Sequence, residues 1–177
     1  MALGYIMIDT SNALKIDGWM FDDELEWLAQ QAQKHQNILE IGSWKGRSTR
    51  ALGDNTPGRV WAVDYWLEHD CEMRQFLENL SDLIIAERVI VMRTTSNNVT
   101  TMLHNTHRSF FDMIFLDGDH CYESVKSDIS NCIPLLSPGG ILCGHDYSVA
   151  WEGVMRAVEE ILPNFYLHNT IWYKEIK

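Results

Sequence analysis

Three titratable side chains, Asp117, Asp119 and His120, stand together in the stretch FLDGDHCYES. They follow an apolar run that begins at Phe111 and has the composition of a buried strand. A carboxylate can ligate a metal ion or cap a helix, and an imidazole, with an ordinary pKa of about 6.5, can accept a proton near neutral pH. One acid could simply cap the next helix, but three such groups within four residues indicate a reaction site.

A second pair of such groups, His145 and Asp146, follows the later apolar run GGILCG. If the two runs are neighbouring parallel strands, their ends lie about 4.8 Å apart. One small cation could then contact Asp117 and this pair. Oxygen-rich sites of this kind suit Mg²⁺ or Mn²⁺ better than zinc.

Glycine residues follow the first strand-like run, in LEIGSWKGRST. Gly42 and Gly46 allow a tight turn and a close approach of the backbone to a ligand. The exposed amides at the start of the next helix favour a carboxylate or phosphate. A plain turn between strand and helix explains the loop equally well when it is taken alone.

Two further polar features end the second and third strand-like runs. Asp64 stands where an acid commonly accepts hydrogen bonds from ribose hydroxyls, although it could also cap a helix or be solvated. Thr94, Thr95 and Ser96 could contact an adenine ring or cap the following helix. Together with the glycine loop, these features favour a nucleoside site.

Composition and charge limit the class of protein and its partners. The chain has 177 residues, of which 46% are hydrophobic and 22% are charged, as expected for one globular domain. Its formal net charge is −11, which disfavours a nucleic-acid partner and favours neutral or cationic small molecules.

The sequence also carries a prediction about its compartment. No apolar run is long enough to span a bilayer, and the first residues, MALGYIMIDT, carry no basic leader. The four cysteines are scattered, without a Cys-x-x-Cys pair. We expect free thiols, no membrane partner and a cytoplasmic location.

Strand-like and helical patterns alternate along the chain. Apolar runs typical of buried strands cover residues 37–42, 58–64, 88–92, 111–117 and 139–144, and helical spacing covers 21–32, 46–54, 71–84, 97–105, 122–133 and 154–161. Residues 164–169 and 170–176 read as two antiparallel strands. The pattern predicts an α/β fold with a doubly wound, mostly parallel seven-stranded sheet and a C-terminal hairpin. We expect one domain over 1–177, with an N-terminal helical extension at 1–36 and a Rossmann-like core at 37–177.

The glycine spacing separates two nucleoside-binding classes. A dinucleotide site wants Gly-x-Gly-x-x-Gly, whereas three residues separate Gly42 from Gly46 here. Glu40 stands two residues before the first glycine. This arrangement resembles motif I of class I S-adenosylmethionine-dependent methyltransferases, except that Trp44 takes the place of a central glycine.

The resemblance extends over nearly the whole chain. LEIGSWKGRST, VWAVDYW, FLENL, FLDGDHCYESVKSDI and LLSPGGILCGHDY occur in the order found in a group of sugar O-methyltransferases of macrolide biosynthesis and cephalosporin-hydroxylase-like proteins. The resemblance implies that the cofactor is held by Glu40, Gly42, Ser43, Gly46, Asp64, Ser96 and Asp117. It also implies a divalent metal held by Asp117, Asp146 and His145, where His145 replaces an acid and favours softer ions.

The predicted function is S-adenosylmethionine-dependent methylation of a small-molecule hydroxyl on a sugar-like acceptor. The base would come from His120, our first choice, or from Asp119. Tyr147 and Trp151 could belong to the core, but are expected to wall the acceptor pocket. A lid would come from a neighbouring subunit of a homo-oligomer or from the segment near Met1 to Phe21. A non-catalytic cofactor-binding protein, suggested by His145, and an NAD-dependent oxidoreductase are the alternatives.

Overall fold

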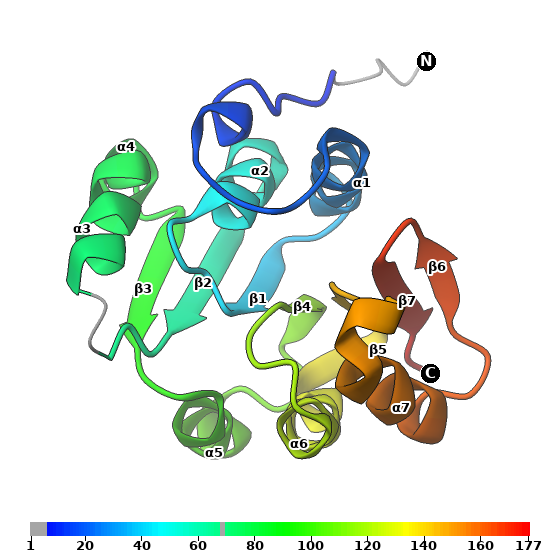
Figure 1. Ribbon diagram of the computed structural model, residues 1–177. Coiled ribbons are helices and arrows are strands. Elements are labelled where there is room, and N and C mark those ends of the chain that lie inside the picture. The colour runs from blue at the N-terminus through cyan, green and yellow to red at the C-terminus, as the bar shows by residue number, and fades with distance from the viewer. Residues whose placement is uncertain (1–6, 68–69) are drawn as a thin grey trace, which may run out of the picture.

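The computed structural model describes residues 7–67 and 70–177 and contains one seven-stranded sheet (Figure 1). The strands are β1 (Asn37–Ile41), β2 (Arg59–Asp64), β3 (Val89–Arg93), β4 (Phe111–Leu116), β5 (Leu136–Gly144), β6 (Tyr166–His168) and β7 (Ile171–Glu175). Their order is β3-β2-β1-β4-β5-β7-β6. The pairs among β1 to β5 are parallel, and β7 pairs antiparallel with both β5 and β6. The predicted fold class is therefore confirmed.

Helices connect the strands and cover both faces of the sheet (Figure 1). They are α1 (Asp22–Ala32), α2 (Arg47–Asn55), α3 (Asp70–Asn79), α4 (Ser81–Ile85), α5 (Ser96–Thr106), α6 (Tyr122–Cys132) and α7 (Glu152–Ile161), with 3₁₀ turns η1 (Ala13–Lys15), η2 (Ile133–Leu135) and η3 (Val149–Trp151). Among the described residues, no helix has the length and apolar character needed to cross a bilayer.

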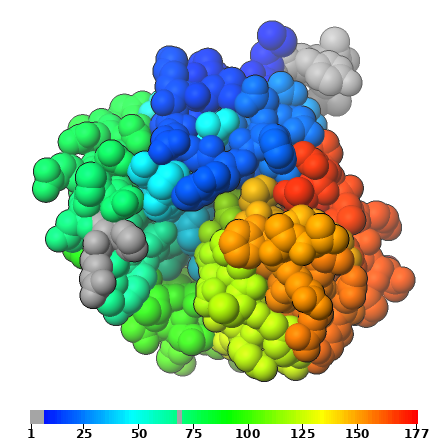
Figure 2. Space-filling view, viewed as in Figure 1, coloured from blue at the N-terminus to red at the C-terminus, as the bar shows by residue number. Residues whose placement is uncertain are grey.

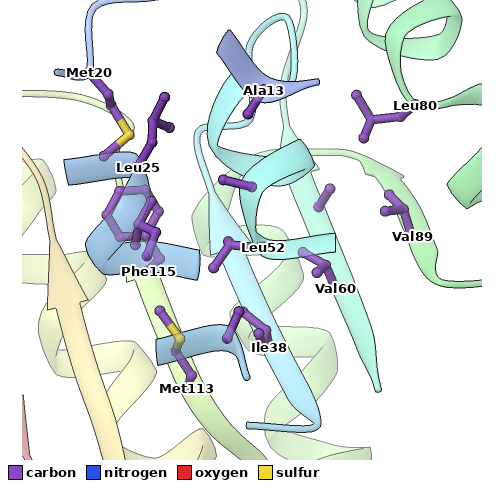
Figure 3. Packing of buried hydrophobic residues seen from close by; sticks show 14 of the residues in the cluster. Ala13, Met20, Leu25, Ile38, Leu52, Val60, Leu80, Val89, Met113 and Phe115 are labelled. Atoms are coloured by element: carbon purple, nitrogen blue, oxygen red, sulfur yellow. The ribbon is translucent and has the colours of Figure 1, made fainter. Parts of the chain in front are cut away.

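Two apolar clusters fill the space between the sheet and its helices. One cluster joins α1, α2 and α4 to one face of the sheet, and Figure 3 shows its side chains, including Leu25 from α1, Leu52 from α2 and Phe115 from β4. The other cluster joins α5, α6 and α7 to the opposite face, through residues such as Ile114 and Leu142. Because both faces are covered, the strands are near-continuous apolar runs instead of alternating ones.

The structure departs from the sequence pattern between residues 71 and 84. One helix is expected there, but α3 and α4 are separated at Leu80, which has φ −111° and ψ 7°. Leu80 is fully buried, and Gly46 lies so close to it that a Cβ at Gly46 would be 2.3 Å from Leu80 Cδ2. Beside it, Asn79 Nδ2 donates to the Lys45 carbonyl at 2.9 Å. The break therefore allows this region to support the glycine loop.

The strand order reverses between β1 and β4, which lie side by side at the centre of the sheet. In such sheets ligands bind outside the carboxyl ends of the strands, next to this reversal. The Asp117 N–H donates to the Ile41 carbonyl at 2.8 Å, which joins the residue after β4 to the last residue of β1. The predicted site residues Gly42 and Asp117 are thereby brought together.

Candidate active site

A cavity of about 920 Å³ opens at the carboxyl ends of the strands. The predicted site residues that line it are Gly42, Ser43, Asp64, Ser96, Asp117, Asp119, His120, His145 and Asp146. On the face shown in Figure 2, the blue N-terminal segment and the orange segment around η3 lie next to each other. Residues from both, including Trp19 and Trp151, line the cavity. Its size suits a small molecule of the size that proteins usually enclose.

Glu40 and Gly46 are predicted cofactor residues that lie outside the cavity lining. Glu40 is fully buried, where it accepts hydrogen bonds from the hydroxyls of Ser43 (2.7 Å), Ser48 (2.6 Å) and Thr49. Burial raises the pKa of its carboxyl to about 7, an effect that the three hydroxyls offset only in part. Glu40 thus holds the glycine loop, through Ser43, and the start of α2, through Ser48 and Thr49.

The glycine loop keeps a left-handed backbone where the family resemblance leads one to expect a central glycine. Trp44 has φ 41° there, between Gly42 at 93° and Gly46 at 90°. This turn directs the Trp44 N–H to Asp64 Oδ2 at 2.8 Å, while the Trp66 N–H donates to Asp64 Oδ1 at 2.9 Å. The Trp66 indole N–H donates to the Trp44 carbonyl at 2.8 Å. Asp64 is therefore fixed at the cavity wall.

The polar turn after β3 caps a helix and also faces the cavity. Thr95 caps α5, because its hydroxyl accepts the Asn98 N–H at 3.2 Å. Thr94, Thr95 and Ser96 also line the cavity, as does Asp128 from α6. Burial raises the pKa of the Asp128 carboxyl, which a hydrogen bond from Ser96 partly offsets.

Asp117, His120 and Asp146 form a group that we call the acidic cluster. Each offers one ligand atom, and these atoms lie within 4.8 Å of one another. His120 Nε2 lies 2.7 Å from Asp146 Oδ2, and the His120 ring stacks on Trp151 with centroids 4.0 Å apart. The hydrogen bond to Asp146 raises the pKa of His120 above its usual value, although burial works against it. The ends of β4 and β5 thus bring these three side chains side by side.

Asp119 also lines the cavity, but its carboxylate is engaged at the start of α6. It accepts the Cys121 N–H at 3.0 Å and the Ser124 hydroxyl at 2.7 Å. These hydrogen bonds lower its pKa. Asp119 therefore makes the capping contacts weighed for it, and a carboxylate with a lowered pKa is a weaker base than His120.

His145 lies beside the acidic cluster, with carboxylates around its ring. Nε2 is 3.0 Å from Glu24 Oε2, and Nδ1 is 3.6 Å from Asp117 Oδ1 and 3.4 Å from Asp146 Oδ1. Burial alone would lower the His145 pKa, but the three carboxylates outweigh it and raise the pKa to about 12. Burial likewise opposes ionisation of Glu24, yet hydrogen bonds from His145, Thr170 and Phe21 lower its pKa to about 2. The three carboxylates around His145 thus favour the protonated form of its imidazole.

Residues 16–22, which we call the N-terminal strap, pass over the glycine loop. Trp19 stacks on Trp44 with centroids 4.3 Å apart. Lys45 Nζ lies 2.8 Å from Asp17 Oδ2, and Arg47 donates to the Ile16 carbonyl at 3.1 Å. Two residues of the loop and the first residue of α2 therefore hold three residues of the strap.

The strap belongs to the segment that the sequence analysis named as one of two possible sources of a lid, beside a neighbouring subunit. Gly18, Trp19 and Met20 line the cavity although they precede the first predicted helix. Of the two aromatic residues expected in the pocket wall, Trp151 lines it. The hydroxyl of Tyr147 instead donates to Glu159 at 2.7 Å, and its ring packs against Phe165. Tyr147 is therefore a poor candidate for the pocket wall.

The strand order, with a cavity at the strand reversal, matches the class I methyltransferase architecture. A family model described as a methyltransferase domain matches residues 39–147. The match covers more than half of the chain, and the chain belongs to this family. The class of protein predicted from the motifs, the class I S-adenosylmethionine-dependent methyltransferases, is therefore confirmed.

Individual relatives are more distant. The uncharacterized protein y4gI of Sinorhizobium fredii is 30% identical in an alignment of 170 residues. The match covers 85% of this chain and 18% of that protein. The chain thus spans about a fifth of the length of this relative.

Solved structures share the fold at low sequence identity. The O-methyltransferase from Bacillus cereus in complex with SAH is 19% identical with a TM-score of 0.73, over 98% of this chain and 94% of that chain. CalS11, a TDP-rhamnose 3′-O-methyltransferase of calicheamicin biosynthesis, is 16% identical with a TM-score of 0.64, over 86% of this chain and 76% of that chain.

Proposed function

We propose that this protein transfers the methyl group of S-adenosylmethionine to a hydroxyl of a small molecule. The observation that carries the proposal is the meeting of two sets of residues in one cavity. The glycine loop, Asp64 and Ser96 line one part of it, and the acidic cluster lines another. A methyl donor and a proton acceptor are thereby brought to the same space.

The first set suits the cofactor. Asp64 is held by two backbone N–H groups at the position of a ribose-binding acid. Ser96 and its neighbours suit the adenine ring, and Gly42, Ser43 and Asp117 suit the methionine portion. Glu40 and Gly46 shape the loop from outside the cavity. S-adenosylhomocysteine bound to the Bacillus cereus structure of the same fold supports this assignment.

The second set suits proton transfer. The sulfonium already activates the methyl group, so the protein must mainly position the hydroxyl in line with it. His120 is the base, because Asp146 holds its ring and Trp151 stacks on it. Asp119, the other candidate, is occupied at the start of α6. The hydroxyl proton passes to His120 as the oxygen attacks the methyl carbon, and S-adenosylhomocysteine leaves as the neutral thioether.

A divalent ion fits the acidic cluster by the chemistry of its donors. The carboxylates of Asp117 and Asp146 offer oxygen ligands, which suit Mg²⁺ or Mn²⁺. When bound, such an ion lowers the pKa of a coordinated hydroxyl. His145, the third predicted ligand, directs both ring nitrogens at carboxylates, so Asp117 and Asp146 would hold the ion and His120 keeps its role as the base.

The acceptor is a neutral or cationic hydroxyl compound, because five carboxylates line the cavity and the chain carries a net charge of −11. A sugar-like acceptor is supported by CalS11, which shares the fold. A cytoplasmic location agrees with the free thiols of the four cysteines. A homo-oligomer stays a prediction.

The test is transfer of a labelled methyl group from S-adenosylmethionine to a panel of uncharged phenols, monosaccharides and glycosides. Reactions contain either Mn²⁺ or a chelator. The proposal expects acceptor-dependent labelling of a hydroxyl, reduced at least about 100-fold in His120→Gln. A protein that binds S-adenosylmethionine but labels no member of the panel would instead be the non-catalytic binder.

A further inference from the structure

Glu24 is a fully buried carboxylate that joins separate parts of the chain around the site. Its Oε2 accepts the backbone N–H of Phe21 at 3.0 Å and faces His145 Nε2 at 3.0 Å. Its Oε1 accepts the backbone N–H (3.1 Å) and the hydroxyl (2.6 Å) of Thr170, in the turn between β6 and β7. One side chain therefore fixes the end of the strap, the terminal hairpin and the end of β5.

The other edge of the His145 ring faces the acidic cluster. Nδ1 lies 3.6 Å from Asp117 and 3.4 Å from Asp146. The ring thus stands between Glu24 and the two carboxylates that would bind a cation. His145 is itself buried, with 7% of its surface exposed, so its ring has little freedom to turn.

Asp146 is held from two sides in an uncommon backbone conformation. Its φ of 65° lies in the left-handed region, which non-glycine residues seldom adopt. Oδ1 faces His145, and Oδ2 lies 2.7 Å from His120 Nε2. A conformation of this kind persists where the surroundings fix it, and such positions concentrate at functional sites.

We infer that Glu24 and His145 act as a positioning pair that orients Asp117 and Asp146 for a divalent cation bound by the acidic cluster. The inference rests on the metal-assisted form of the proposed function. Glu24 fixes the imidazole, and the imidazole sets the direction of both carboxylates. His145 therefore acts from outside the ligand set, and its neighbour Asp146 acts within it.

The chemistry of metal sites gives the size of the effect. Residues that orient ligands without touching the ion typically change metal affinity 10- to 100-fold when they are replaced. Because Glu24 reaches Asp117 and Asp146 through His145, replacing both should cost no more Mn²⁺ affinity than replacing His145 alone. Two residues that merely stabilise the fold would give additive losses of stability and leave Mn²⁺ affinity unchanged.

The experiment is calorimetric titration of Mn²⁺ into the full chain saturated with S-adenosylhomocysteine. Glu24→Gln, His145→Gln and the double variant are compared with wild type. Glu26→Gln is the matched control, because Glu26 is an exposed residue of the same helix. Thr170→Val is a milder variant that removes only one donor to Glu24. Thermal unfolding and affinity for S-adenosylhomocysteine are measured on every variant.

The inference expects a 10- to 100-fold loss of Mn²⁺ affinity in Glu24→Gln and His145→Gln. It expects no further loss in the double variant, a smaller loss in Thr170→Val and none in Glu26→Gln. Wild-type Mn²⁺ affinity in the folded variants, or additive losses in the double variant, would overturn it. Binding of S-adenosylhomocysteine without any binding of Mn²⁺ by wild type would also overturn it, and would leave metal-free methyl transfer standing. A wild-type protein that does not bind S-adenosylhomocysteine would contradict the proposed function itself.

Discussion

The backbone of Gly42 lies directly against the carbonyl of Asp117, so that a Cβ on Gly42 would be 2.0 Å from that oxygen. The contact joins the ends of β1 and β4 at the reversal of strand order. Gly42 also has φ 93°, a conformation that side chains rarely permit. The two motifs recognised in the sequence, one at each residue, therefore depend on each other's geometry.

Gly42→Ala is expected to destabilise the protein by at least about 3 kcal/mol, because the clash is with backbone and the positive φ adds strain. Chemical denaturation measures the change. Gly118→Ala is the matched control, since the nearest atom to a Cβ there is 3.8 Å away. Equal stability of the two variants would contradict the close approach of β1 and β4.

Glu40 should make stability depend on pH. Its pKa is raised to about 7 in the folded state from 4.5, so the folded protein holds this proton over a range where the unfolded chain has released it. Stability is therefore lost as pH rises from 4.5 through about 7, by up to about 3 kcal/mol. Glu40→Gln should remove this part of the pH dependence.

Urea denaturation at pH 5, 6, 7 and 8 tests the role of Glu40. The control is Glu123→Gln, which changes an exposed acid of α6 and should keep the wild-type slope. If the free energy of unfolding varies with pH in the same way in Glu40→Gln and in wild type, the pKa of Glu40 is not raised in the folded protein.

His120 should set the pH dependence of methyl transfer. As a base it must be neutral, and Asp146 raises its pKa above the usual 6.5. Activity should therefore fall as pH drops through a value above 6.5, which gives the pH profile an acidic limb. The profile of His120→Gln should lack this limb. His35→Gln, placed before β1 at the opposite end of the strand, should keep the limb. If the acidic limb is unchanged in His120→Gln, another residue is the base.

Trp44→Gly should separate the strap from cofactor binding. The left-handed backbone suits glycine, so the N–H that donates to Asp64 is retained. The stack with Trp19 and the contact of Lys45 with the Trp44 ring are lost. The free energy needed to open residues 16–22 should fall by about 1 kcal/mol, while affinity for S-adenosylhomocysteine changes little. Amide hydrogen exchange in the strap measures this, and unchanged exchange would contradict the docking.

The sequence predicted those parts of the site that lie next to their motifs. Asp64 ends a strand and Gly42 and Asp117 directly follow one, so the parallel sheet alone brings them to one edge. Glu24 could not be found in this way, because it is one of three consecutive acids and its partner Thr170 is 146 residues away. Spacing along a helix does not show which acid of its first turn will be buried.

Spacing along the chain also does not show the position of Trp19 in the strap or the break between α3 and α4. Trp19 carries no periodic signal, and its place in the cavity depends on Trp44, whose left-handed turn is not visible in the composition of the loop. The break at Leu80 arises because Leu80 packs on Gly46, which is a tertiary contact that overrides helical propensity.

The most direct test of the account is calorimetric titration of the protein with S-adenosylmethionine, S-adenosylhomocysteine and NAD. The account predicts binding of the first two and none of NAD, with an affinity for S-adenosylhomocysteine at least about 10-fold lower in Asp64→Ala, since each buried charge-assisted hydrogen bond contributes about 1.5–3 kcal/mol. Binding of NAD, or no binding of the methyl donor, would contradict it.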